Sequence, residues 1–280
     1  MTTTATDIQP GVYDITADDY HADPVPGGSL SSTGARKLLP PGCPALYHYE
    51  QGHQQTKPAR HLEFGTAVHT LAFGDGPGLV RIDADSYRTK EAQQAAAKAR
   101  AQGAVPLLAA EMQQAEDMAA ALLAHPQAGE LLTGGEAEQT YLWRDEETGI
   151  WCRARMDYVR PGEVVDLKTT QDVSLDALIK TIHKWGYHQQ RDWYIRGYRA
   201  IWGHDPEWKF IFIDKNPPYL ITVVDCDVTS ALIGEARNRR ARHIFAECQR
   251  TGIWPAHDQQ IWTLPLPAWA EKNDLEEYVK

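Results

Sequence analysis

The pattern of apolar and polar positions changes near residue 136. Before that point apolar residues recur at helical spacing, and those at 64, 67, 68 and 71 predict a helix over 60–73. Two stretches rich in Ala, Gln and Glu, 89–102 and 106–124, are separated by Gly103 and Pro106 and predict a helical hairpin. The first 30 residues are rich in Asp, Pro and Gly, so we expect an extended lead-in with little regular structure.

After residue 136 the chain reads as strands and helices in turn. Two β-rich runs, 140–143 and 150–156, flank a polar loop and predict a hairpin, and 163–168 predicts a third strand. Helices are expected over 174–184, 187–202 and 229–250, with a second hairpin made by 209–213 and 220–224. We expect the tail, 252–280, to be irregular and to wrap the surface. The order predicts one α/β domain over 1–280, a central mixed β-sheet flanked by helices.

Composition narrows the class of protein. With 42% hydrophobic and 24% charged residues the chain has the composition of an ordinary globular protein. It has no apolar stretch long enough for a membrane span, and its N-terminus lacks the charged and apolar regions of a signal peptide. The cysteines form no CxxC pair, which favours reduced thiols and a cytoplasmic location; they are Cys43, Cys152, Cys226 and Cys248.

The net charge of −10 argues mildly against a general nucleic-acid binder, although a locally basic channel can coexist with an acidic surface. The densest basic cluster falls on the predicted helix 229–250. On a helix its arginines would spread over a wide face and could contact DNA phosphates. The alternative is a solvated helix balanced by Glu235 and Glu247. The candidate DNA-binding residues are Arg237, Arg239, Arg240 and Arg242.

Candidate chemistry concentrates in the third predicted strand. Val164 and Val165 precede Asp166 and Lys168, whose side chains should point the same way because alternate residues of a strand share a face. A second acid, Asp157, is expected at the end of the preceding strand. Two carboxylates and an amine at a sheet edge can hold Mg²⁺, or Mn²⁺ in its place, and activate a water for phosphodiester hydrolysis.

Weaker candidates surround this group. Glu138 heads the first strand of the hairpin and could join the acids, with Glu136 as its competitor. His69 lies four residues after Gly65, which we expect to allow close approach of another backbone, and could ligate a metal. For Glu138 the alternative is a solvated acid at a strand start, and a lone helical histidine is more typical of a satisfied core or surface residue. Gln190 and Tyr194 share one helix face and could hydrogen-bond a phosphate or base, or simply pack.

Taken in order, these residues resemble the PD-(D/E)xK nuclease superfamily and, within it, the RecE-like phage exonucleases of the exodeoxyribonuclease VIII type. The resemblance covers most of the chain, and its motifs are weak singly but strong in combination. Met156 stands where the family's half-motif has proline. The matching segments are 11–14, 20–21, 29–31, 44–47, Phe64-Gly65-Thr66-Ala67-Val68-His69, 145–153, Asp157, Asp166-Leu167-Lys168-Thr169-Thr170 and 187–194.

The resemblance implies a restriction-endonuclease-like core. It implies that Asp157 and Asp166 bind the metal, that Lys168 is the catalytic lysine, and that His69 is the helical histidine at the site. Gln190 and Tyr194 would form the helix motif that follows the core, and Glu138 an additional acid. The family digests linear double-stranded DNA 5′ to 3′ with Mg²⁺ and passes a 3′ strand to an annealing protein. Some such exonucleases form rings around DNA.

Three other interpretations compete. A nuclease of the CRISPR-adaptation or AddB type would need four thiolates for an iron–sulfur cluster, and the spacing of these cysteines disfavours it. A catalytically silent DNA-binding or assembly module could keep the fold, but Asp157, Asp166 and Lys168 together argue against it. A hydrolase of free nucleotides is disfavoured only weakly.

Overall fold

A mixed β-sheet forms the centre of the computed structural model, which describes residues 8–53, 60–257 and 261–279. The strand order is β1-β5-β6-β7-β8-β9, with β2 added beside β6. Pairing is parallel between β7 and β8 and between β2 and β6, and antiparallel elsewhere. The strands are β1 (Gly11–Tyr13), β2 (Leu30–Ser31), β5 (Glu136–Arg144), β6 (Trp151–Arg160), β7 (Glu163–Thr170), β8 (Glu207–Asp214) and β9 (Ile221–Val224). The predicted mixed sheet is confirmed.

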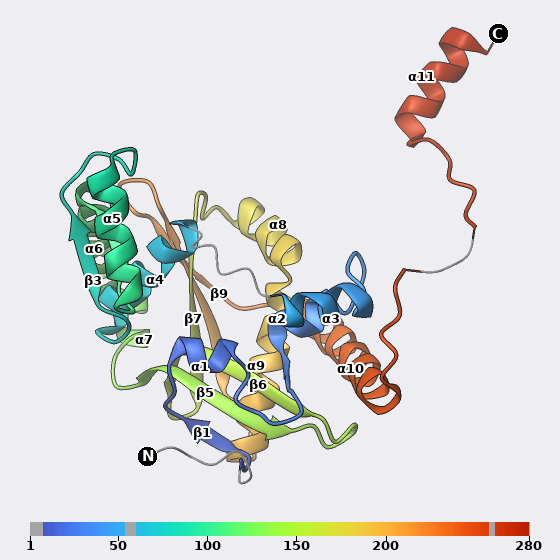
Figure 1. The fold of residues 1–280 in the computed structure, drawn as a ribbon, viewed down its shortest axis with the longest axis horizontal. Coiled ribbons are helices and arrows are strands. Elements are labelled where there is room, and N and C mark those ends of the chain that lie inside the picture. The colour runs from blue at the N-terminus through green and yellow to red at the C-terminus, as the bar shows by residue number, and fades with distance from the viewer. Residues whose placement is uncertain (1–7, 54–59, 258–260, 280) are drawn as a thin grey trace.

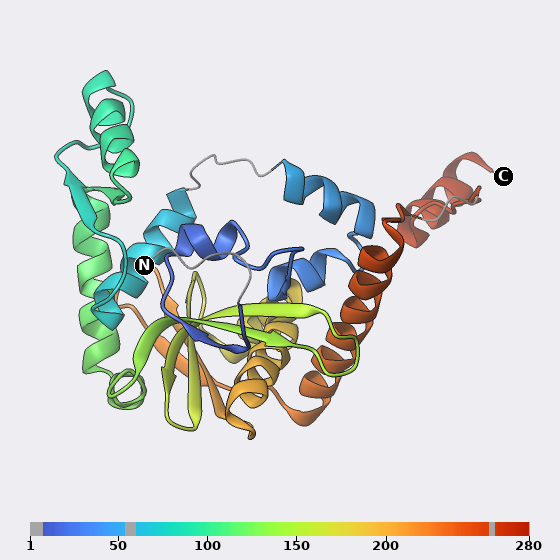
Figure 2. The same cartoon turned by 60° about the horizontal axis from the view of Figure 1, so that its bottom comes forward.

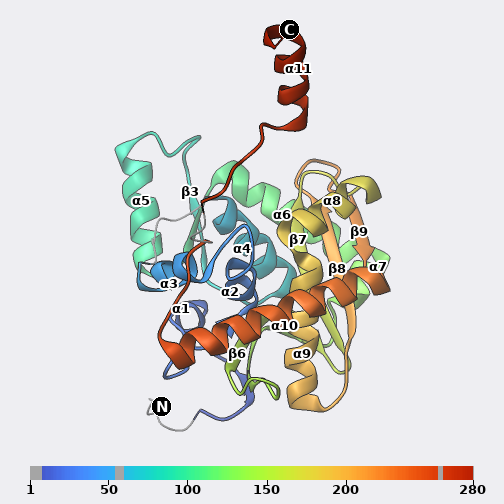
Figure 3. The ribbon, with the colours of Figure 1, turned by 90° about the vertical axis from the view of Figure 1, so that its right-hand side faces the viewer.

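Helices cover both faces of this sheet (Figures 1 and 2). They are α1 (Ala17–His21), α2 (Ser32–Lys37), α3 (Pro44–Gly52), α4 (Arg60–Phe73), α5 (Lys90–Ala101), α6 (Ala109–Ala124), α7 (Pro126–Leu131), α8 (Leu175–Trp185), α9 (Tyr187–Trp202), α10 (Val228–Thr251) and α11 (Ala268–Tyr278). One core lies between the sheet and α2, α8, α9 and α10, and the other between the sheet and α4, α6 and α7. In Figure 3 the long α10 crosses α9, against which it packs.

Strand alternation divides the apolar residues between these two cores. On β8, Phe210 and Phe212 enter the core under α9, while Ile211 and Ile213 enter the core under α4 and α6. On β7, Val165 and Leu167 face the α4 side. Successive strand residues point to opposite faces, so Asp166 lies on the side where α9 packs.

The pairing of β6 with β7 is short. It consists of Tyr158 with Val165 and the two pairs nearest the turn. Beyond these, β6 pairs with β5 and β7 pairs with β8. By this register, Asp157 faces Asp166 at the first position where the two strands no longer pair. Asp157 therefore lies inside β6, which runs on to Arg160, and not at the strand end that we expected.

Residues 8–30 contain more regular structure than we predicted for the lead-in, whose first seven residues lie outside the described part of the chain. Strand β1 pairs with β5, and α1 contributes the buried Tyr20. Arg153 on β6 donates to Asp23 Oδ2 at 2.6 Å and to the Ser29 carbonyl at 2.7 Å. Its guanidinium carbon also lies 5.4 Å from the centre of the Tyr20 ring. The lead-in is ordered because an arginine of a distant strand supplies partners that local composition cannot reveal.

The predicted helical hairpin is also wrong, although both helices exist. Between α5 and α6 the chain forms β4 (Val105–Leu108), which pairs in parallel with β3 (Leu79–Ile82) as a separate two-stranded sheet. This pairing separates the two helical arms. Each strand is four residues long, too short for a clear alternation signal.

The tail after α10 differs from the irregular wrapping segment that we predicted. Gly252 ends α10 in the left-handed conformation, with φ 72°. Residues 268–278 form α11, which has no buried residue. Figure 1 shows the tail leading away from the sheet and not along its surface.

Two glycines on helices give a matched test of packing. A Cβ at Gly234 on α10 would overlap the carbonyl oxygen of His188 on α9, whereas a Cβ at Gly65 on α4 meets no described atom within 4 Å. Gly65 therefore does not serve the close approach that we expected. Gly234→Ala should lower the free energy of unfolding by about 1–3 kcal/mol, because α9 and α10 must move apart.

Gly65→Ala is the control, and it should raise stability by up to about 1 kcal/mol through helix propensity. Urea unfolding of both variants measures the difference. Equal effects at the two positions would contradict the close approach of α9 and α10.

Candidate active site

The predicted catalytic acids and lysine meet where β6 and β7 separate. Asp166 is fully buried, and its Oδ1 accepts a hydrogen bond from Gln190 Nε2 at 2.9 Å. The Lys168 ammonium forms an ion pair with Asp166 Oδ2 and lies 3.7 Å from Asp157 Oδ2. Asp157 Oδ2 also accepts the Leu167 backbone N–H at 3.0 Å. One lysine thus lies between two opposed carboxylates.

His69 and Glu138 reach this group from α4 and β5. His69 Nε2 donates to the Leu167 carbonyl at 3.0 Å, because a carbonyl only accepts. Its Nδ1 then faces Glu138 Oε1 at 3.8 Å and Asp157 Oδ2 at 3.9 Å. Arg155 donates to Glu138 Oε2 at 2.8 Å. Glu138 and not the exposed Glu136 joins the acids.

The backbone of Glu138 is strained. Its φ is +53°, a left-handed value that is uncommon for residues other than glycine. The flanking pairs Ala137 with Tyr158 and Gln139 with Met156 place it opposite Asp157. Such outliers persist only where surrounding contacts hold them, and they cluster at functional sites.

The electrostatics of the group show an excess of negative potential. Burial, with a contribution from Asp157, raises the pKa of Asp166 to about 7. Burial lowers the pKa of His69, but Asp157 and Glu138 outweigh it, so the pKa is raised. The pKa of Lys168 is likewise raised, because Asp157 and Asp166 outweigh its burial. Protons are thus drawn to a place where a divalent cation would be favoured for the same reason.

The donor set suits a hard cation, although its side chains are not arranged around one. In the part of the chain that the structure describes, no group of three or more His, Cys, Asp and Glu could hold a metal ion as placed. Lys168 acts as the counter-charge of both aspartates instead. Carboxylate oxygens are the ligands that Mg²⁺ prefers, and it needs only one or two of them. Asp157 and Asp166 fit that requirement once the ammonium moves aside.

Helix α9 supports the group from below. Gln190 orients Asp166. Tyr194, which follows Gln190 by four residues on the same helix face, is buried against Trp208, with ring centres 5.8 Å apart. Sequence reasoning assigned no role to Tyr187, yet the Lys168 ammonium lies 5.4 Å from the centre of its ring. The sequence signal at this corner is the glycine at 186, which ends α8 and begins α9 in the left-handed conformation.

The predicted arginine face on α10 is not a continuous cationic surface. Arg242 is fully buried and pairs with buried Asp145 at 2.8 Å, so its assignment as a DNA-binding residue is wrong. Arg237 donates to Gln189 Oε1 at 3.1 Å, and Arg239 donates to Glu147 at 2.9 Å. Arg240 is exposed and has no ion pair among the residues described.

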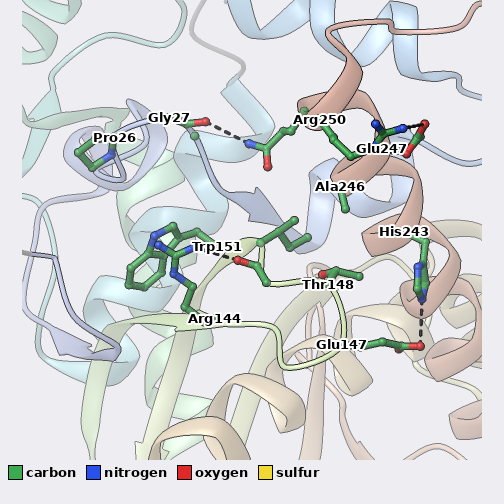
Figure 4. A pocket seen from close by; sticks show the side chains of 14 residues that line it. Pro26, Gly27, Arg144, Glu147, Thr148, Trp151, His243, Ala246, Glu247 and Arg250 are labelled. Atoms are coloured by element: carbon green, nitrogen blue, oxygen red, sulfur yellow. Dashed lines mark hydrogen bonds and ion pairs between the residues drawn. The ribbon is translucent and has the colours of Figure 1, made fainter.

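An open cavity of about 570 Å³ lies beside this helix, apart from the acids (Figure 4). Its walls are the loop between β5 and β6, the end of α10 and residues 26–28. His243 pairs with Glu147 at 3.0 Å and Arg250 with Glu247 at 2.6 Å, whereas Arg144 donates to the Gly149 carbonyl and lies over the Trp151 ring. None of the predicted catalytic residues lines it.

The sheet, its flanking helices and the acid–lysine group define a PD-(D/E)xK-type fold. Residues 31–261 match the family described as a PDDEXK-like domain of unknown function (DUF3799), and the chain belongs to that family. It is thereby placed in the PD-(D/E)xK nuclease superfamily.

Solved structures agree with this fold. A protein from Eubacterium rectale named "Putative exonuclease" matches with a TM-score of 0.57 and 16% identity, over 92% of this chain and 98% of that one. At that identity the likeness shows the fold alone. No curated protein matches the chain. No described helix is long and apolar enough to cross a membrane.

Asp166 should make the stability of the metal-free protein depend on pH. Its folded pKa is raised to about 7 from 3.8, so its contribution is fully present below pH 3.8 and is lost as pH rises through 7. Asp166→Asn removes this dependence. The stability of the variant relative to wild type should rise across this interval, by at most about 1.4 kcal/mol per pH unit.

Urea unfolding at pH 5 and pH 8 in the presence of a chelator measures this difference. Glu163→Gln, on the same strand but paired with Arg160 at 2.6 Å, controls for the loss of a carboxylate. A stability difference between wild type and Asp166→Asn that is the same at both pH values would contradict the raised pKa.

Proposed function

We propose that this protein is a Mg²⁺-dependent deoxyribonuclease that hydrolyses phosphodiester bonds at the Asp157–Asp166–Lys168 group. The observation that carries the proposal is the meeting of two opposed carboxylates and one ammonium at the split between β6 and β7. Membership of a PDDEXK-like family supports it. Structural metal sites and surface ion pairs do not need a fully buried acid facing another acid.

Each residue has a role that follows from its contacts. Asp157 and Asp166 would hold Mg²⁺, which when bound supplies an activated water and neutralises phosphate charge. Lys168, next to both acids, would stabilise the charge that develops on the scissile phosphate. Gln190 holds Asp166 by its hydrogen bond. His69 fixes the Leu167 carbonyl and presents Nδ1 to the acids.

The finer proposal is a 5′-to-3′ exonuclease of the RecE-like type that leaves 3′ single strands for recombination. It is supported by the order of motifs in the sequence and by the fold likeness to a protein named as an exonuclease. Under this proposal the substrates are ends of double-stranded DNA. The partners would be an annealing protein and other copies of the chain in a ring. A catalytically silent module with the same fold is the competing hypothesis.

Hydrolysis of end-labelled linear and closed circular duplex DNA with Mg²⁺ tests this function. Asp166→Asn and Lys168→Ala should each lower the rate at least about a hundredfold, because each removes a charge that acts in the transition state. Lys168→Ala should still bind DNA. Glu163→Gln should keep wild-type activity.

The DNA forms separate the hypotheses. Loss of linear but not circular DNA indicates an exonuclease, and loss of both indicates an endonuclease. No Mg²⁺-dependent loss of either form by the wild-type protein would leave the silent module.

Metal binding should compete with protonation of Asp166. A carboxyl group with a pKa of about 7 is mostly protonated at pH 6, and a protonated acid is a poor ligand. Mg²⁺ at about 10 mM should raise the melting temperature, because binding to the folded state stabilises it. This rise should grow from pH 6 to pH 8. Asp166→Asn should abolish both the rise and its pH dependence. A rise that is independent of pH would place the metal elsewhere.

A further inference from the structure

Arg36 on α2 is a cation beside the candidate active site that lacks a carboxylate partner. Its guanidinium donates to the Trp185 carbonyl and, at 3.3 Å, to Thr33 Oγ1. No ion pair joins it to any acid that the structure describes, whereas Arg153, Arg155 and Arg191 each have one. Its Nε is buried and has no hydrogen-bond partner in the described part of the chain. The positive charge of Arg36 is therefore not neutralised by any described acid, and it would attract an anion that approaches the site.

The position of Arg36 is fixed against the corner between α8 and α9. A Cβ at Gly186 would lie 2.8 Å from Arg36 Cδ, so the stem of the arginine packs on a residue with no side chain. Burial lowers the pKa of Arg36, while Tyr194, Tyr187 and Asp166 raise it. Tyr187 also interacts with Lys168. Gly186, on which the Arg36 stem packs, directly precedes Tyr187, so Arg36 lies next to the residue whose ring contacts the Lys168 ammonium.

Trp185 belongs to the same corner. Leu178, Ile182 and Trp185 follow one stripe of α8; Leu178 is buried and Ile182 packs against the core. Trp185 continues that stripe beyond the core, and 53% of it is exposed. The Lys184 ammonium lies 5.3 Å from the centre of its ring. An exposed indole with Lys184 against its ring and Arg36 bound to its main-chain carbonyl is suited to stacking a nucleobase next to a phosphate-binding cation.

We propose that Arg36 and Trp185 form a subsite for one unpaired nucleotide next to the scissile phosphate. The guanidinium binds its phosphate and the indole stacks on its base. This inference rests on the proposed nuclease function and names the kind of substrate that the site takes. A base inside a duplex has both faces covered by its neighbours, so only an unpaired or terminal base can stack on Trp185. The site therefore favours DNA with a single-stranded or frayed segment.

Arg36 could instead have only a structural role, in which its guanidinium caps the last carbonyls of α8. The structural role and the subsite predict different effects of removing the Trp185 ring, because capping uses only the main-chain carbonyl of that residue. They differ also for salt dependence, because only a phosphate contact releases counterions.

Binding of a fluorescent 12-nucleotide single strand, and of the same sequence as a blunt duplex, tests the subsite; the length covers about one such site. Measurements use fluorescence anisotropy in the Asp166→Asn background, which prevents hydrolysis. Trp185→Ala should weaken binding of the single strand at least about fivefold and affect the blunt duplex less. Trp202→Ala is the matched control, because Trp202 is 54% exposed, lies at the far end of α9 and donates to Tyr141 on β5.

Arg36→Ala should weaken binding of the single strand and reduce the slope of log K against log salt by about 0.7. Arg36→Lys keeps the charge and should restore most of that slope. A purely structural role of Arg36 predicts no such recovery. Melting temperatures within a few degrees of the parent establish that the variants are folded.

The outcomes separate the two proposals. If Trp185→Ala binds the single strand as tightly as Trp202→Ala does, the subsite is wrong, even where the wild-type protein cleaves DNA. If Arg36→Ala leaves the salt slope unchanged, the phosphate contact is wrong. Should wild type fail to cleave while binding depends on Trp185 and Arg36, the nucleotide-binding subsite stands, but the nuclease proposal and the place of the subsite beside a scissile phosphate fall.

Discussion

Repulsion between two carboxylates determines how the centre of this molecule is arranged. Asp157 and Asp166 face each other at the point where β6 and β7 stop pairing, and Asp166 is fully buried. Two facing carboxylates, one of them buried, cannot both remain ionised without a compensating cation. Lys168 supplies it from the same strand as Asp166, two residues on. The burial that makes Asp166 costly to ionise is also what would make it a strong ligand once a metal is present.

The remaining polar groups of the site come from elements far apart in the chain. Arg155 joins the N-terminal segment to the acids, because it donates to the Ile15 carbonyl at 2.6 Å and to Glu138 at 2.8 Å. His69 comes from α4 on one side of the split and Gln190 from α9 on the other. At the split between β6 and β7, α4 thus reaches Asp157 and α9 reaches Asp166. A continuous sheet at this point would keep them apart.

Elements with a strong local signal were predictable, and so were the residues of the acid group. The helix over 60–73 follows from its spacing, and Asp166 with Lys168 follows from strand alternation. What failed depends on distant partners. Arg242 looks like a surface arginine until Asp145 is placed beside it, and the lead-in looks irregular until Arg153 is placed under it. The sequence gives no reason to single out Arg36, because only the folded structure shows that no described acid pairs with it.

Strand β1 has a consequence for how copies of this protein behave together. Its three residues cover Thr140 to Leu142 on the outer side of β5. A chain that loses this strand to a protease would expose backbone donors and acceptors of β5, next to the buried rings of Tyr141 and Trp143. Such an open edge is a template for pairing between molecules. We expect β1 to limit such pairing, because it covers this part of β5.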